Sequence, residues 1–459
     1  MKKTRLAAGL LALVSLFGGL LTAAPAQATQ VTVTVWVPWG TGSDYYNMWN
    51  AAAARIEAKN ANINVVVQGD KDMAVSLAAI NAGNGPDISI ANGVGNVGWF
   101  CGTGAWKNLN VLIAGSNGIN LTKTFTKASI AGTYSRGVRC ALPFSSEIFG
   151  FYYNKTLLKS VGWTKPPTTT TELKTLSKKL TKFDSAGNIV RAGYIPWAGA
   201  ADNDMGSLFL GAMFGAQFFD PMGGTSYFYK DKRWEKAFRW QKSFIADVYG
   251  GGDFNKGSRR IKKFFATAGG FWGANNDFVT GRLAMLSHAD WMASMFCSGD
   301  DWTLNPCTTP LVNMGVAGFP VDPSIKKTNY GAGIVGANTM GISRGSAHVN
   351  EAWTVMKGLA TDKTLSLSWS NMTGDPSSLL AARGKANGAV YPAFYQGFYD
   401  ISAHPKSGYH VLANTGEHLE ESGLQDLMSA WQAGSQTNIT KGLQELAAHV
   451  NQILKRNNN

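Results

Sequence analysis

The chain is poor in the residues that build metal centres. Its 459 residues include only four cysteines and six histidines. The histidines are scattered, and neither a CxxC nor an HExxH spacing of a zinc site occurs. We therefore expect no metal and no cofactor. Because no glycoside-hydrolase motif is visible either, we interpret the chain as a non-enzyme with no catalytic residues.

Long apolar runs are also scarce, and none reaches the roughly 20 residues that span a bilayer. The nearest is Leu6–Leu21, which follows a basic start and precedes Ala26-Gln27-Ala28. This pattern is typical of a secretory signal peptide over residues 1–28. Because no cysteine stands near the cleavage site, we expect a soluble, exported product without a lipid anchor, either periplasmic or extracellular.

The few cysteines are even in number, which in an exported protein favours two disulfides. Cys297 and Cys307 would close a short loop, leaving Cys101 and Cys140 as the other pair. The count alone does not fix this connectivity.

Acidic residues are outnumbered, since 42 lysines and arginines face 29 acidic residues for a net charge of +13. Basic residues cluster at Lys230–Lys242 and Lys256–Lys263. These clusters are compatible with solvated helix faces or, alternatively, with an anionic surface or ligand. With no recognisable nucleic-acid-binding motif, we expect no nucleic-acid partner.

Strand and helix patterns alternate along the mature chain. Alternating valines over 31–37 and the run INVVVQ over 63–68 predict strands, and helical spacing follows each of them. A third short strand is expected at Asp87–Ile90. This order predicts an α/β protein built on an open, largely parallel sheet.

Several segments carry a family resemblance. They are VTVTVWVPW, GPDISIANG, LPFSSEIFGFYYNKTLLKSVGWTKPPTTTTEL, FVTGRLAMLSHADW, GVAGFPV, GANTMGISRGSAHVNEAWTVMKGLATD and SNMTGDPSSLLAA. Their order resembles that of the extracellular solute-binding proteins of ABC importers. More narrowly, it is similar to the sugar-binding, maltose-binding-protein-like group (family 1).

The resemblance implies a two-lobed periplasmic-binding-protein fold (type II), with a ligand cleft between lobes joined by a multi-stranded hinge. Residues 29–144 would start lobe I, 145–320 would form the first part of lobe II, 321–374 would return to lobe I, and 375–459 would add C-terminal helices to lobe II. Chain crossings would fall near Pro143–Glu147, Phe319–Pro323 and Asn371–Pro376. The implied partners are a sugar and the membrane subunits of an ABC importer, and the protein would be a monomer.

A neutral sugar is bound by flat aromatic rings and by planar polar groups that pair with its hydroxyls. Trp291 matches the cleft tryptophan of the family, and Glu147 stands where the family often places a sugar-binding acid. The other candidates follow strands or occupy turns: Trp39, Ser43, Asp44, Asn92, Trp197, Asp202, His288, Asp290, Gly374 and Asp375. Alternatives are an N-cap for Ser43 or Asp44, bonds to its own backbone for Asp290, and a hinge role for Glu147.

The leading function is capture of a sugar or oligosaccharide for import. On the same fold, glycerol phosphate or a polyamine is an alternative ligand, although Asp375, where the family usually has an apolar residue, disfavours an anion. Two alternatives come from other classes. An exported glycoside hydrolase could use Glu147 and Asp290 as its carboxylate pair, and a wall- or polysaccharide-binding adhesin would fit the basic charge.

Overall fold

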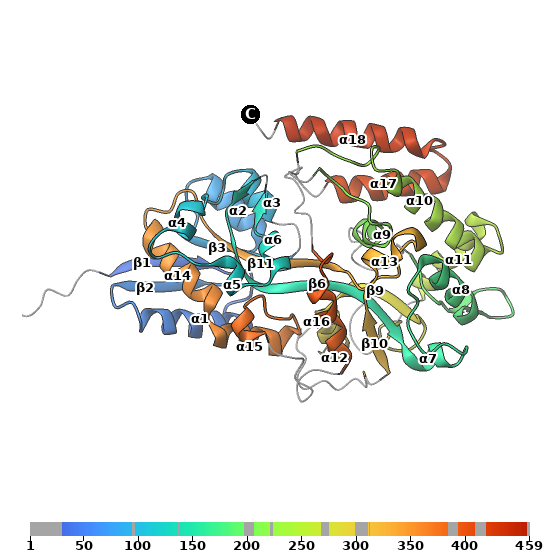
Figure 1. The fold of residues 1–459 in the computed structure, drawn as a ribbon, viewed down its shortest axis with the longest axis horizontal. Coiled ribbons are helices and arrows are strands. Elements are labelled where there is room, and N and C mark those ends of the chain that lie inside the picture. Colours follow the sequence, from blue (N-terminus) through green and yellow to red (C-terminus); the bar gives the residue numbers. More distant parts are fainter. Residues whose placement is uncertain are drawn as a thin grey trace, which may run out of the picture.

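The computed structural model describes residues 30–93, 97–135, 137–196, 206–220, 224–267, 275–298, 311, 313–383, 393–408 and 419–456, except for the side chains of 297, 298 and 419–421. Two groups of helices flank a sheet that runs through the whole molecule (Figure 1). Each group encloses its own hydrophobic core. We call the core that contains Phe144 the first core and the core that contains Ile148 the second core.

The first lobe is built on three parallel strands. They are β1 (Val31–Trp36), β2 (Ile63–Gln68) and β3 (Ile88–Ala91), with β1 pairing both others. Val33, Val35 and Val37 are fully buried, as the alternating pattern predicts. Around this lobe lie α1 (Asp44–Glu57), α2 (Met73–Asn81), α3 (Val97–Gly102), α4 (Asn110–Ala114), α5 (Leu121–Thr124), α6 (Lys127–Ala131), α14 (Val349–Thr361), α15 (Lys363–Thr373) and the hairpin β4 (Tyr134–Ser135)–β5 (Val138–Arg139).

Two long strands carry the sheet from one lobe into the other (Figure 1). They are β6 (Leu142–Asn154) and β11 (Ile334–Ile342), which pair antiparallel. Antiparallel partners β9 (Met285–Ala289) and β10 (Met314–Ala317) flank β6, and β11 pairs antiparallel with β3. The expectation of a largely parallel sheet is therefore wrong outside β1–β3, because β6 and β11 cross between the lobes in opposite directions.

The two cores show where the chain changes lobe. Within β6 the change falls between Phe144 in the first core and Ile148 in the second, inside the expected crossing. Within β11 it falls between Val335 and Met340. The crossing expected near Phe319–Pro323, with its boundary at 320/321, is wrong, since Phe319 is still packed in the second core. The amphipathic pattern could not locate it, because every residue of β11 is buried.

The third crossing also lies later than expected. Leu379 and Ala382 still pack in the first core, and Phe394 is the next described residue in the second. The boundary at 374/375 is therefore too early. The bridge between Leu379 and Phe125 explains this, because it holds the segment after α15 against the first lobe.

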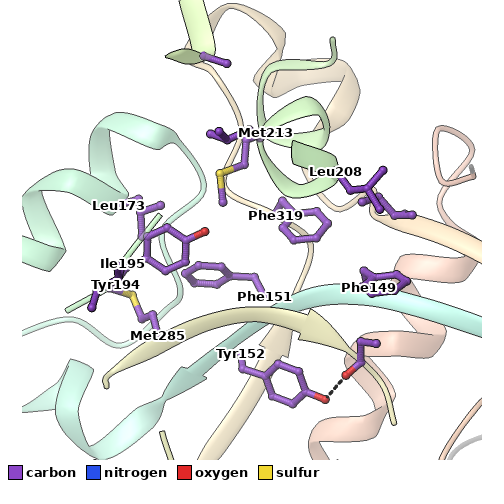
Figure 2. Close-up of a cluster of buried hydrophobic side chains, with 14 of the residues drawn as sticks. Phe149, Phe151, Tyr152, Leu173, Tyr194, Ile195, Leu208, Met213, Met285 and Phe319 are labelled. Carbon is purple, nitrogen blue, oxygen red and sulfur yellow. Dashed lines mark hydrogen bonds between the residues drawn. The ribbon is translucent and has the colours of Figure 1, made fainter. Parts of the chain in front are cut away.

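Aromatic side chains fill the second core. Figure 2 shows Phe149 and Phe151 on one face of β6 and Tyr152 on the other, as a strand alternates its side chains. The lobe contains α7 (Lys155–Lys159), α8 (Thr170–Leu180), β7 (Lys182–Phe183), β8 (Ile189–Arg191), α9 (Gly206–Phe214), α10 (Lys232–Ile245), α11 (Phe254–Ala266), α12 (Met292–Ser298), α13 (Lys326–Asn329), α16 (Gln396–Ala403), α17 (Leu419–Ala433) and α18 (Ile439–Arg456). No helix in the described ranges is both long and apolar enough to cross a membrane.

A disulfide joins Cys101 at the end of α3 to Cys140 just before β6, with 5.8 Å between the Cα atoms. Both residues belong to a small third core with Ile80, Phe100 and Trp106. The Cys101–Cys140 pair is thus confirmed. The expected pair Cys297–Cys307 lies outside the residues whose side chains are described.

Candidate functional site

Trp291 follows β9 directly and is held by a carboxylate from the neighbouring strand. Its indole Nε1 donates a hydrogen bond to Oε1 of Glu147 on β6, at 2.9 Å. The His288 ring meets the indole edge to face, with ring centroids 4.8 Å apart. Glu147 and His288 are buried, whereas Trp291 is partly exposed. The ring is therefore fixed in orientation while part of its surface remains open.

Asp290 ties the turn after β9 to β6. One carboxylate oxygen accepts from the backbone N–H of Ile148 at 3.1 Å, and the other accepts from that of Trp291 at 3.0 Å. The Tyr395 hydroxyl donates to the Asp290 carbonyl at 2.9 Å. These bonds match the alternative in which a turn aspartate bonds to nearby backbone, so Asp290 positions Trp291.

In the first lobe, Asp375 is a turn carboxylate that accepts from an indole, as Glu147 does from Trp291. Gly374 ends α15 with φ +88°, a left-handed conformation that favours glycine. The chain then turns so that Asp375 accepts from Nε1 of Trp369 at 2.9 Å. Its backbone N–H donates to the Thr373 hydroxyl at 3.0 Å, which fixes the turn. In both lobes, then, a buried carboxylate orients an indole.

The carboxyl groups of Asp290 and Asp375 meet at the junction of the lobes. Glu147, Asp290 and Asp375 are all at most 5% exposed. Burial raises the pKa of Asp375 to about 7, even though the hydrogen bonds that its carboxyl group accepts from the Trp369 and Asp290 side chains oppose the rise. Burial, followed by the charges of Asp375 and Glu147, raises the pKa of Asp290 well above its ordinary value. The Asp290–Asp375 pair therefore retains a shared proton near neutral pH.

Aromatic rings cluster in the first lobe beside this junction. Trp39, in the loop after β1, stacks on Tyr45 and on Trp49, with centroids 5.8 and 5.9 Å apart. Trp369 meets Trp39 edge to face, with ring centroids 4.9 Å apart. Burial and the nearby charge of Asp375 raise the pKa of Tyr45, which places this cluster next to the carboxyl pair. Trp39 and Tyr45 are only partly buried, so their surfaces remain available.

Two further candidates in this loop have a different setting. Ser43 is the N-cap of α1, and its hydroxyl accepts from the Tyr46 N–H at 3.2 Å, as the structural alternative predicts. Asp44 is exposed in the first turn of α1. Both residues lie at the start of α1, which supports a role in helix initiation more than contact with a ligand.

Asn92 follows β3 and is partly buried near a hinge contact that sequence reasoning missed. The Asn338 side chain on β11 accepts from the Gly93 N–H at 2.7 Å and donates to the Ser145 hydroxyl on β6, also at 2.7 Å. The available signal was the polar pair Asn338-Thr339 inside the otherwise apolar run IVGANTMGI. Trp197 and Asp202 lie outside the described residues.

The structure thus gathers Glu147, His288, Asp290 and Trp291 from the second lobe, and brings Asp375 to them from the first. Trp39 contacts Trp369, and the Trp369 indole donates to Asp375, so Trp39 is connected to the same group. Trp369 was not among the candidates predicted from the sequence. The signal for Trp369 was its place six residues before Asp375 in a helix that ends at a Thr-Gly turn.

Residues 51–394 match the family model of bacterial extracellular solute-binding proteins. The chain belongs to this family. Among curated proteins, no sequence matches it significantly. The solute-binding family membership and the fold agree with the resemblance drawn from the sequence motifs.

Solved structures of similar shape cover nearly the whole chain. CpMnBP1 with mannotriose bound matches with a TM-score of 0.69 and 22% identity over 92% of this chain and 100% of that one. The sugar-binding protein MalE from Xanthomonas citri matches with a TM-score of 0.68 and 18% identity, over 93% of this chain and 98% of that one. The cyclic alpha-maltosyl-1,6-maltose binding protein from Arthrobacter globiformis matches with a TM-score of 0.66 and 18% identity, over 93% of this chain and 100% of that one. These likenesses confirm the two-lobed α/β solute-binding fold.

Proposed function

We propose that this solute-binding protein captures a neutral sugar or oligosaccharide between its lobes and delivers it to an ABC importer. The observation that carries the proposal is the arrangement of indole rings at the lobe junction. Trp39 and Trp369 come from the first lobe and Trp291 from the second, and buried carboxylates orient Trp369 and Trp291. Trp39 and Trp291 are partly exposed, whereas Trp369 is buried and packs against Trp39. Partly exposed rings with a fixed orientation suit the apolar CH faces of a pyranose.

Ordered polar groups accompany the rings. Glu147 lies beside Trp291, Asn92 follows β3, and Asn338 links β11 to both neighbouring segments. Planar carboxylate and amide groups can pair with two sugar hydroxyls at once, which gives specificity beyond stacking. The ligands of the fold neighbours, mannotriose and cyclic maltosyl-maltose, are of the proposed class.

The carboxyl groups argue against the alternative ligands and reactions. An anion such as glycerol phosphate would face the buried carboxyl groups of Glu147, Asp290 and Asp375, which disfavour a second group of the same charge. Glu147 is engaged by an indole and Asp290 by two backbone N–H groups, which supports positioning roles rather than a hydrolytic pair.

Closure of the lobes follows from the strands that connect them. β6 and β11 are the paired connections in the sheet, so the lobes can rotate about a narrow region near Glu147 and Gly336. Ligand contacts from both lobes would favour the closed form, which the importer's membrane subunits would then recognise.

A thermal-melting screen of residues 29–459 tests the proposal. The panel contains mannose- and glucose-based oligosaccharides, glycerol phosphates and polyamines. A ligand at 100 times its dissociation constant adds about 2.7 kcal/mol to the folded state. We expect a shift with one sugar class that Trp291→Ala abolishes and Trp163→Ala, in the turn after α7, preserves. A shift only with a phosphate or a polyamine would overturn the sugar assignment.

A further inference from the structure

Unpaired cations gather on the outer face of α11. Its inner side is fixed by Ile261 and Phe264, which are buried in the second core. The outer side exposes Lys256, Arg259, Lys262 and Lys263. The helix contains no acidic residue, and none of these four cations forms an ion pair with a carboxylate in the described part of the chain. The outer face is thus a strip of uncompensated positive charge.

The end of α8 and the β7–β8 hairpin extend this strip. Lys178, Lys179 and Lys182 are exposed there. The Arg260 guanidinium of α11 lies over the Phe183 ring of β7, 4.7 Å from its centroid. The two elements are therefore neighbours, as Figure 1 shows for α8 and α11. We call the exposed cations of α8, β7 and α11, together with this hairpin, the basic surface.

The neighbouring helix α10 is equally rich in cations, but three of its five cations form ion pairs with carboxylates. Arg233 pairs with Asp231 at 2.7 Å, and Arg239 pairs with Glu235 at 2.8 Å. Lys236 reaches Asp322, also at 2.7 Å. Near the basic surface, Asp184 accepts from Asn188 and Asp253 caps α11. Hydrogen bonds from Asn188 and, to a lesser degree, the charge of Lys263 lower the pKa of Asp184, but the Asp184 and Lys263 side chains form no ion pair. The exposed cations of the basic surface, unlike these cations of α10, therefore form no ion pairs in the described part of the chain.

Exposed apolar side chains lie within the same surface. Phe183 is 40% exposed and Val190, on β8, is 47% exposed. Solvation of the charges alone does not account for the exposed Phe183 ring beside Lys182 on β7, whereas the interface of a lipid bilayer accommodates both groups. Anionic headgroups attract juxtamembrane lysines and arginines, and aromatic rings settle at headgroup level.

We propose that the basic surface docks the protein on an anionic phospholipid bilayer. The lysines and Arg259 contact the headgroups, and Phe183 and Val190 enter the headgroup region. Docking would confine the receptor to the plane in which an importer resides, so that it searches two dimensions instead of three. An anionic wall polymer would satisfy the cations but would leave the apolar residues without a partner.

Co-sedimentation with vesicles tests the proposal on the mature chain. Vesicles with about 30% phosphatidylglycerol in phosphatidylcholine are compared with pure phosphatidylcholine at low salt and at about 150 mM salt. We expect binding to the anionic vesicles alone, and weaker binding at higher salt. The triple variant K179E/K262E/K263E should lower the partition coefficient at least tenfold. The matched variant K59E/K123E/K127E, with the same charge change on the first lobe, should change it less than about twofold.

Phe183→Ser separates lipid from polymer because it leaves the net charge unchanged. It should lower vesicle binding severalfold at about 150 mM salt, where the charges are screened. Melting temperatures of all variants report that they are folded. Equal binding by the two triple variants would overturn the proposal. Binding to poly(glycerol phosphate) without binding to vesicles would overturn it too, as would a Phe183→Ser variant that binds like the wild type.

Discussion

Removing the shared carboxyl proton at the lobe junction should change how stability depends on pH. In the folded chain burial raises the pKa of Asp375 to about 7, against an ordinary value of 3.8. Between these two values the folded state holds a proton that the unfolded state has lost. The free energy of unfolding therefore falls as pH rises through this window and is flat above it.

The size of the effect follows from the same two values. Between about pH 5 and pH 8, a group with these pKa values makes the free energy of unfolding fall by about 3 kcal/mol. Asp375→Asn cannot titrate but keeps a side-chain oxygen for the Trp369 indole, which now donates at 2.9 Å. The variant should thus lose up to this amount of pH dependence, and Asp290 accounts for what remains.

Urea unfolding of the ligand-free wild type and of the variant across this pH range measures the difference. Asp400→Asn is the matched control, because Asp400 is exposed on α16 and should leave the pH dependence as it is. If Asp375→Asn shows the same slope as the wild type between about pH 5 and pH 8, the carboxyl pair holds no shared proton and the electrostatic reasoning is refuted.

Three further changes probe other parts of the structure. Replacing Cys101 and Cys140 by alanine opens a loop with a sequence separation of 39 and should lower the free energy of unfolding by about 3–4 kcal/mol in urea titrations. Glu147→Ala should weaken sugar binding about tenfold or more by calorimetry because the Trp291 indole loses its acceptor, whereas Glu147→Gln, which keeps an acceptor oxygen, should weaken it less. Gly374→Ala should destabilise the fold by about 1–2 kcal/mol in the same titrations because of its φ of +88°, and an unchanged midpoint would argue against this turn conformation.

Local features of the fold were predictable from the sequence. Alternating valines gave β1, Ser43 gave the start of α1, and Thr169 caps α8 by accepting from the Glu172 N–H at 3.1 Å. Thr169 and Glu172 have the sequence spacing of a capping box, but the Glu172 carboxylate accepts from the backbone N–H of Thr168 instead of that of Thr169. Such signals succeed because they depend on residues a few positions apart.

Long-range pairing was not predictable in the same way. β6 and β11 are about 190 residues apart in the sequence, and both are buried along almost their whole length, so no alternation reveals their direction or the point of crossing. The Asp290–Asp375 contact likewise depends on how two turns from different lobes meet. Asp290 and Asp375 could each be selected from the turn in which it stands, but their pairing across the two lobes could not.

Calorimetric titration of the best sugar from the melting screen tests the central claim most directly. Wild type is compared with Trp39→Ala, Trp291→Ala and the distant control Trp163→Ala. If the sugar is held by rings from both lobes, each of the first two variants should lose about 2 kcal/mol of binding free energy, or about 30-fold in affinity. The control should bind like the wild type. Unchanged affinity in both Trp39→Ala and Trp291→Ala would contradict a sugar site between the lobes.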